Sequence, residues 1–284
     1  MAPPDRLYER APPAPARLAA GPLWHLDTTR TCFIGPLTYN APHQHGAPVF
    51  LAGIYGDFAL RLAGGDWRRA RTAMIPAGMV HELDVGGQPI GVLYIEPSLA
   101  GPACLAALTG NAEESGGALL GAAGECAPLR ALWEDADSAD WAGEALDDFL
   151  GFGVRRARRP LDPRIARIMA SLDEADDWPG VADACARVGL SAHHFQHLFT
   201  REVGVPYRRY RAWRRLRLAI GAVASGSRLT AAAHEAGFCD QAHFTRAFRH
   251  TFGAPPSWSL SGVRMSGDPA RQRTAAPISE QPAR

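Results

Sequence analysis

The sequence predicts an α+β protein, in which a β-rich N-terminal region precedes an all-α C-terminal domain built from a repeated helical unit. Three observations favour this class. Short apolar runs separated by glycine and proline fill residues 24–96, a texture typical of strands. From residue 100 onwards, apolar residues recur at helical spacing. The pattern Phe-x-x-x-Phe-x-x-x-x-Gly begins at Phe195 and again at Phe244.

The N-terminal region contains six predicted strands. The glycine pairs at 64–65 and 86–87 predict hairpin turns between strands, because glycine adopts the positive φ that tight turns require. Regular short strands with such turns indicate a small barrel or sandwich. The predicted strands are Thr31–Tyr39, Val49–Tyr55, Asp57–Leu62, Ala70–Ile75, Val80–Val85 and Ile90–Ile95.

Composition and periodicity divide the chain into six parts. The helical region after the strands carries an apolar stripe at Trp141, Ala145, Phe149 and Phe152, which could form a dimer or pack back on the β domain. A basic run follows at residues 155–159, and Pro160 would break any helix that continued through it. The predicted parts are a disordered arm (1–22), a β domain (23–99), a helical dimerisation or packing region (100–153), a basic linker (154–161), a helical domain (162–260) and a disordered tail (261–284).

The repeat in the C-terminal domain predicts two helix-turn-helix units. Phenylalanines four residues apart lie on one face of a helix, so Phe195 and Phe199 point inward and leave the opposite face free. Gly189 suits the turn before this helix, and Gly204 suits its end. The second copy repeats these positions 48–49 residues later, and a long helix from about Pro206 joins the two units.

Charge supports a polyanionic partner for this domain. Residues 201–250 hold ten arginines against three acids, although the whole chain has a net charge of only +1. All 30 basic residues are arginine, whose planar fork suits phosphate and guanine. The alternative is that these arginines only solvate helix faces.

Cysteine spacing and hydropathy exclude several classes. The five cysteines are scattered without a Cys-x-x-Cys pair, which argues against disulfide scaffolds and zinc fingers. No apolar run approaches the roughly 20 residues of a membrane helix, and the N-terminus lacks the apolar segment of a signal peptide. We therefore expect a cytoplasmic protein without a membrane partner.

Residues 161–260 resemble the AraC/XylS family of bacterial transcription regulators. The matching stretches include Val188-Gly189-Leu190-Ser191, Gly237-Phe238 and Phe252-Gly253. The resemblance implies that both recognition helices enter successive major-groove segments of double-stranded promoter DNA. Its base-contact candidates are His193, Gln196 and His197 in the first recognition helix, and Gln241, Ala242 and Arg246 in the second. Arg208 and Arg211 are the expected sequence-independent contacts.

The chemistry of these side chains fits such roles. Arg246 can bind guanine O6 and N7 with two hydrogen bonds, and Gln196 or Gln241 can bridge adenine N6 and N7. His193 and His197 can donate to phosphate or to base acceptors. The alternative for each residue is ordinary solvated surface.

The fragments His43-x-His45 and Pro76-x-Gly78-x-x-His81 look like the two signature motifs of the cupin barrel. Cupins that bind metal commonly add a glutamate, but Val49 or Phe50 stands at its place here. Three imidazoles could still hold zinc, nickel or another divalent ion. Alternatively, the histidines line an effector pocket or satisfy hydrogen bonds of loops.

Together these patterns predict a regulator of transcription that is not an enzyme. The cupin-like barrel would sense a small molecule or metal ion, the helices after it could form a homodimer, and RNA polymerase would be a partner if the protein activates. The alternative is a cupin metalloenzyme fused to a DNA-binding domain, which the absent carboxylate argues against.

Overall fold

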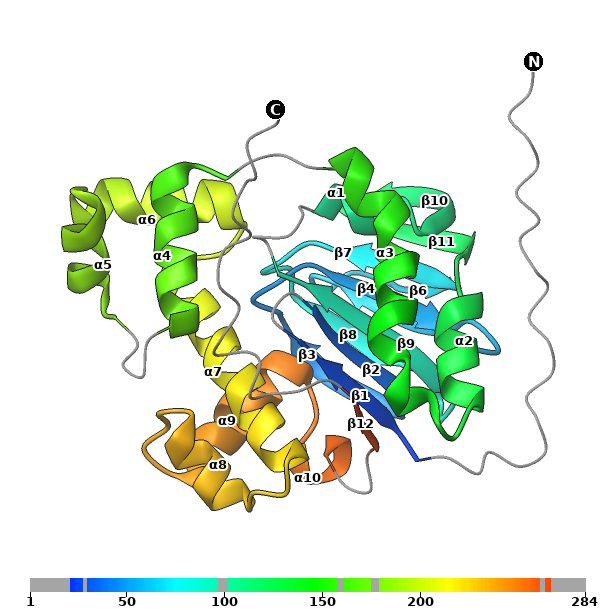
Figure 1. Ribbon diagram of the computed structural model, residues 1–284. Helices are drawn as coiled ribbons and strands as arrows, with labels where there is room; N and C mark the ends of the chain where they lie inside the picture. The colour runs from blue at the N-terminus through cyan, green and yellow to red at the C-terminus, as the bar shows by residue number, and fades with distance from the viewer. Residues whose placement is uncertain are drawn as a thin grey trace, which may run out of the picture.

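The computed structural model describes residues 21–27, 30–96, 102–157, 161–174, 179–260 and 264–266. A two-layer β domain lies against a helical C-terminal domain, and a helical layer covers the other face of its larger sheet (Figure 1). The predicted N-terminal arm falls outside the described residues except at Gly21 and Pro22. Within the described ranges, no helix is long and apolar enough to span a bilayer.

The β domain consists of two sheets and is not the closed barrel that the sequence predicted. The larger sheet has the order β10-β11-β7-β4-β9-β2-β1-β12, and the smaller has the order β3-β8-β5-β6. The strands are β1 (Leu23–Leu26), β2 (Arg30–Pro36), β3 (Tyr39–His43), β4 (Val49–Gly53), β5 (Phe58–Leu62), β6 (Trp67–Ala70), β7 (Thr72–Ile75), β8 (His81–Asp84), β9 (Pro89–Ile95), β10 (Thr109–Ser115), β11 (Ala118–Gly124) and β12 (Arg264–Ser266).

The central strand β4 is apolar throughout because both of its faces are buried. Side chains alternate along a strand. Val49 and Leu51 therefore enter the core between the sheets, whereas Phe50 and Ala52 enter the core under the helical layer. That layer contains α1 (Pro102–Ala106), α2 (Ala127–Glu134), the 3₁₀ helix η1 (Ser138–Asp140) and α3 (Ala142–Ala157).

The apolar stripe packs back on the β domain. The ring of Phe149 on α3 lies 6.1 Å from that of Phe50 on β4, and Trp141 and Ala145 pack against the same core. The side chain of Phe152, the last member of the predicted stripe, lies outside the described residues.

Several predicted boundaries are wrong. The region 100–153 contains the hairpin β10–β11, which joins the larger sheet beside β7 and was hidden by its polar, largely exposed first strand. Helix α3 continues to Ala157, into the predicted linker. The predicted disordered tail contributes β12, which pairs in parallel with β1. The turn at 86–87 connects β8 to β9 in the other sheet, so it does not form a hairpin.

The C-terminal domain contains the predicted pair of helix-turn-helix units. Ser191 caps α6 by accepting a hydrogen bond from the His194 amide, and Asp240 caps α9 in the same way through His243. Left-handed Gly204 and Gly253 end these two helices. The helices are α4 (Pro163–Glu174), α5 (Val181–Val188), α6 (Ala192–Val203), α7 (Tyr207–Ala224), α8 (Leu229–Glu235), α9 (Gln241–Phe252) and α10 (Pro256–Ser259).

The long helix α7 is fastened to the β domain through Glu96, a buried carboxylate that follows β9. Tyr210 Oη and Trp213 Nε1 donate to it over 2.8 and 3.0 Å, Arg217 forms a hydrogen-bonded ion pair, and an Arg214 guanidinium nitrogen lies 3.6 Å away. Burial raises the pKa of Glu96, but the two positive charges and the two hydrogen bonds outweigh burial and lower the pKa below its ordinary value. Glu96 is therefore ionised at neutral pH.

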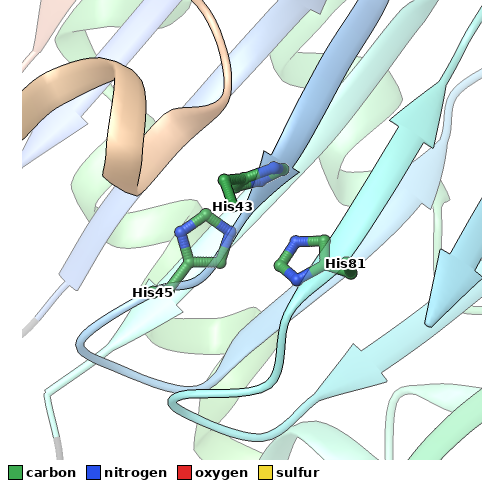
Figure 2. Close-up of side chains that lie close together, drawn as sticks. All are labelled: His43, His45 and His81. Carbon is green, nitrogen blue, oxygen red and sulfur yellow. The ribbon is translucent and has the colours of Figure 1, made fainter. Parts of the chain in front are cut away.

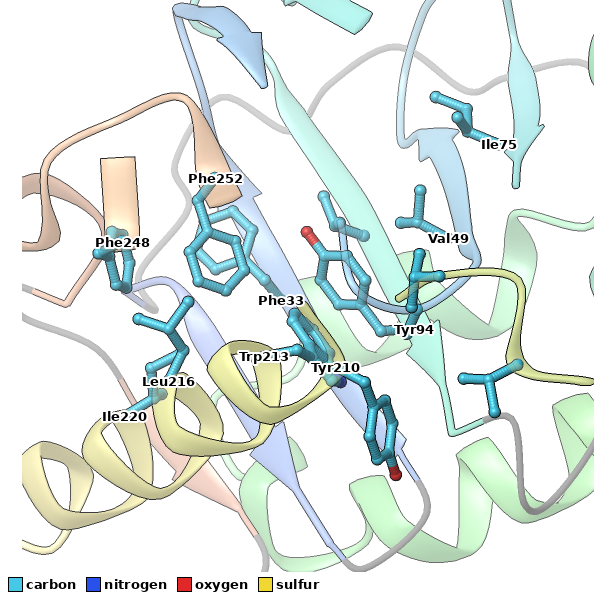
Figure 3. Close-up of a cluster of buried hydrophobic side chains, with 14 of the residues drawn as sticks. Phe33, Val49, Ile75, Tyr94, Tyr210, Trp213, Leu216, Ile220, Phe248 and Phe252 are labelled. Carbon is cyan, nitrogen blue, oxygen red and sulfur yellow. The ribbon is translucent and has the colours of Figure 1, made fainter. Parts of the chain in front are cut away.

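The apolar core runs without a break from the β domain into the C-terminal domain. The Trp213 ring of α7 packs at a tilt against the Tyr94 ring of β9, with centroids 4.8 Å apart, and the Phe252 ring of α9 lies 6.0 Å from the same tyrosine (Figure 3). Trp24 of β1 also meets Phe252, at 6.2 Å. The described parts of the two domains thus form a single packed body.

We expect Glu96→Gln to destabilise the folded chain by about 3 kcal/mol or more, because Arg217 would keep its charge in a buried site without an anion. Urea denaturation followed by tryptophan fluorescence measures this change. Glu113→Gln is the control, since Glu113 pairs with Arg68 at an exposed position and should change stability by about 0.5 kcal/mol or less. Equal effects of the two substitutions would contradict a stabilising role for Glu96.

Candidate DNA interface and sensor pocket

The two recognition helices, α6 and α9, present polar faces to solvent. Their inward faces bury Phe195 and Phe199 in α6, and Phe244 and Phe248 in α9. All six predicted base-contact residues are exposed: His193, Gln196, His197, Gln241, Ala242 and Arg246. The structure therefore leaves these side chains accessible to a major groove.

Arg208 and Arg211, the predicted sequence-independent DNA contacts, differ in exposure. Arg208 is exposed in the first turn of α7. Arg211, one turn later, is half-buried, and its guanidinium lies over the Tyr207 ring at 5.8 Å. On α9, Gln241 accepts a hydrogen bond from the Thr230 hydroxyl of α8 at 2.7 Å, which orients its amide.

The predicted histidines come together inside the molecule. His43 lies at the end of β3, His45 in the following loop and His81 at the start of β8 (Figure 2). Their ring centroids are 4.2–4.9 Å apart, and one potential ligand nitrogen from each lies within 4.8 Å of the others. All three side chains are buried.

Backbone carbonyls set the protonation of two of these rings. The Ala41 carbonyl lies 2.7 Å from His43 Nδ1, and the Met79 carbonyl lies 3.0 Å from His81 Nδ1. A carbonyl can only accept, so Nδ1 carries the proton and Nε2 keeps a lone pair. Burial lowers the pKa of His43 to about 3 and of His81 to about 4, and it also lowers the pKa of His45.

No carboxylate joins this cluster among the residues that the structure describes. Val49 and Phe50, at the place of the cupin glutamate, both belong to hydrophobic cores. Glu82 follows His81 directly, but it binds Arg61 and Tyr39 instead. The cluster thus offers neutral nitrogen donors only.

A cavity beside the histidines is shared by the two domains. Its volume is about 30 Å³, enough for an ion with one or two waters. The β domain and the end of the second helix-turn-helix unit both line it, through Trp24, Phe33, Leu37, Asn40, His43, His45, Leu51, His81, Leu83, Val92, Tyr94, Phe248, Phe252 and Ser259.

The end of α9 is hydrogen-bonded to the strand that carries His43. Asn40 Nδ2 donates to the Phe252 carbonyl over 2.9 Å, and the Ala41 amide donates to the Gly253 carbonyl over 3.2 Å. A Cβ atom at Gly253 would lie 2.8 Å from His43 Nδ1 and 2.7 Å from the Ala41 carbonyl oxygen. Only glycine fits there, so helix and histidine are in direct contact.

Comparisons with known proteins agree with this architecture. A family model described as a helix-turn-helix domain matches residues 184–258. An Escherichia coli protein named as the uncharacterized HTH-type transcriptional regulator YidL is 35% identical over 107 residues, which make up 37% of this chain and 35% of that protein. The chain thus matches about a third of the length of this curated relative.

Two crystal structures of ToxT from Vibrio cholerae share the fold over most of the chain. One, with unsaturated fatty acid bound, is 16% identical with a TM-score of 0.56 and covers 85% of this chain and 99% of its own. The other, from strain O395, is 14% identical with a TM-score of 0.53 and covers 83% and 98%.

Residues 184–258 of this chain therefore match a helix-turn-helix domain of the AraC type. The AraC-type domain begins in the first helix-turn-helix unit and extends through α9 into α10. The likeness to ToxT shows that the order of domains, β-rich first and helical second, is a known arrangement of this fold.

The sequence does not predict which residues line the cavity. Asn40, Phe248, Phe252 and Ser259 line the cavity from segments that are far apart in the chain. The sequence predicts Gly253 only as the end of a recognition helix, and its contact with His43 is seen in the structure alone. Nothing local distinguishes Glu96 from other acids.

We expect the histidine cluster to make the fold acid-sensitive. Because burial lowers the pKa of His43 and His81 below the ordinary value of 6.5, the stability they contribute is fully present above about pH 6.5. It is lost as the pH falls from 6.5 towards 4. His81→Gln should reduce the difference in urea midpoint between pH 7 and pH 5, whereas His234→Gln, at an exposed position of α8, is the control. An unchanged difference in His81→Gln would contradict this prediction.

Proposed function

We propose that this protein is a sequence-specific regulator of transcription, in which the β domain senses a small molecule or metal ion and controls the helix-turn-helix units. The observation that carries the proposal is the cavity shared by the β domain and α9. An occupant of that cavity contacts both domains at once. The two exposed recognition faces on α6 and α9 support DNA as the target.

The proposed DNA contacts divide by chemistry. His193, Gln196 and His197 of α6 would meet base edges in one major-groove segment, and Gln241, Ala242 and Arg246 of α9 would meet the next. Arg208 and Arg211 would bind phosphates. Because Arg211 already packs on Tyr207, Arg208 is the more accessible of the two.

The effector site is proposed at His43, His45 and His81. A ToxT structure with unsaturated fatty acid bound supports ligand binding as a property of this fold. The cavity of this chain is small, and its walls are mainly apolar apart from the three histidines, Asn40 and Ser259, which favours a smaller occupant. A divalent ion such as zinc or nickel fits the donors, and we develop this below.

The regulator is favoured over a cupin metalloenzyme because the matched domain family and the matched relative are both of the DNA-binding regulator type. Such a protein acts in the cytoplasm, where promoter DNA lies, and would contact RNA polymerase if it activates. A homodimer would have to use a surface other than the stripe of α3, which packs on β4.

We expect Arg246→Ala to weaken specific binding by about 1–3 kcal/mol and to relax the base preference at one position, because it removes a two-point contact with guanine. Arg208→Ala should weaken specific and random DNA alike and reduce the salt dependence of binding. The measurement is selection from a randomised DNA pool by the full chain, followed by titrations at several salt concentrations. Equal losses on selected and random DNA for Arg246→Ala would show a phosphate contact instead.

A further inference from the structure

We propose that His43, His45 and His81 bind a divalent transition-metal ion of the zinc class. We further propose that binding of this ion changes the docking of the second recognition helix, α9, on the β domain. This inference rests on the proposed function and deepens it. It names the chemical class of the effector and the element that responds.

The donor set suits such an ion. His43 and His81 each donate Nδ1–H to a backbone carbonyl, which fixes the ring and leaves Nε2 as a ligand. His45 adds a third buried imidazole. The Thr251 backbone lies near this ring, but His45 Nδ1 has no hydrogen-bond partner among the described residues. Three neutral nitrogens with an open fourth position are a common zinc environment.

The size of the cavity selects against larger occupants. A cavity of about 30 Å³ admits an ion and one or two waters. Aromatic rings enclose it, with Tyr94 at 4.8 Å and Phe252 at 6.1 Å from His45. An elongated organic molecule would have to open this packing, whereas an ion would not.

The site lies at the centre of the domain interface. The strand before His43 binds the last turn of α9 through Asn40 and Ala41. The loop after His45 meets α7, where a Cβ at Gly46 would lie 2.5 Å from Cβ of Trp213. The loop before His81 meets the turn between α6 and α7, at Gly78 and Ala77.

Metal binding therefore has a direct effect on α9. Bonds of about 2.0–2.1 Å from one ion to three nitrogens require those nitrogens to approach one another from their present spread of up to 4.8 Å. His43 then pulls on β3, which holds the Phe252 carbonyl through the Asn40 side chain and the Gly253 carbonyl through the Ala41 amide. Because the docked end of α9 closes the site, the ion stabilises the docked state, in which Gln241, Ala242 and Arg246 remain exposed for DNA.

The first experiment measures the ion itself. Full-length chain freed of metal by chelation is titrated calorimetrically with zinc chloride, and cobalt(II) is used in parallel for its tetrahedral absorption bands. We expect one ion per chain, with affinity reduced on the order of 100-fold or more in His81→Ala. His234→Ala, at an exposed histidine of α8, should bind as the wild type does. No binding at 100 µM zinc, or equal loss in the two variants, would overturn the metal site.

The second experiment measures coupling to α9. Hydrogen exchange followed by mass spectrometry should show slower exchange at the end of α9, around Thr251–Gly253, when zinc is added. Gly253→Ala, compared at a zinc concentration that saturates its own site, should lose this protection, because its Cβ would press on His43 and Ala41. Gly189→Ala is the matched control, since Gly189 ends α5 with the same left-handed backbone and nothing within 4 Å of an added Cβ. Zinc binding without any change at α9 would overturn the coupling.

DNA binding separates this inference from the proposed function. With a fragment of the promoter upstream of its own coding sequence, zinc should tighten binding of the wild type about 5-fold or more and leave Gly253→Ala unaffected. DNA binding that is specific but indifferent to zinc overturns the metal inference alone. Absence of specific binding to the fragment and to any sequence selected from a randomised pool, with or without zinc, overturns the proposed function.

Discussion

A single buried charge fixes the geometry of the molecule. Glu96 can remain ionised inside the protein only because Arg217, Arg214, Tyr210 and Trp213 surround it, and all four belong to α7. An ionised carboxylate with these partners has one position that satisfies it, so β9 and α7 cannot slide past each other. Since α7 carries one helix-turn-helix unit at each end, the orientation of both units follows from this contact.

The contact between β3 and α9 is of a different kind. It is made of two hydrogen bonds to backbone carbonyls at the end of α9, one from the Asn40 side chain and one from the Ala41 amide, together with a glycine that has no room for a side chain and aromatic packing around the imidazoles. None of these is a buried ion pair. The imidazole nitrogens that face the cavity keep lone pairs, and how favourably these lone pairs interact depends on what occupies the cavity. The interface thus combines a strong anchor at α7 with a weaker contact at α9 that an occupant can shift.

Much of the C-terminal domain could be predicted because its signals are local. Helical period, caps such as Ser191 and turn glycines such as Gly189 lie within a few residues of the element they define. The β domain was predicted only in part. Apolar runs predict central strands such as β4. By contrast, β10 is a polar edge strand, and β12 pairs with a strand 241 residues away, which no local pattern encodes. The resemblance brought His43, His45 and His81 into one hypothesis, and the structure places them together, but Glu96 and Asn40 matter only through distant partners.

The energies of the two contacts suit a regulator. Breaking a buried ion pair costs about 3–5 kcal/mol, whereas coupling between a ligand and a distant site usually amounts to about 1–3 kcal/mol. A ligand with that coupling free energy cannot detach α7 from Glu96. It can alter the fraction of molecules in which the end of α9 is docked on β3, because that docking depends on hydrogen bonds worth about 1 kcal/mol each. The two units and α7 would then keep their orientation on the β domain, and only the docking of the end of α9 on β3 would change. A purely apolar interface at the same place would be more stable, yet it would have no group whose interactions change when a small polar occupant enters.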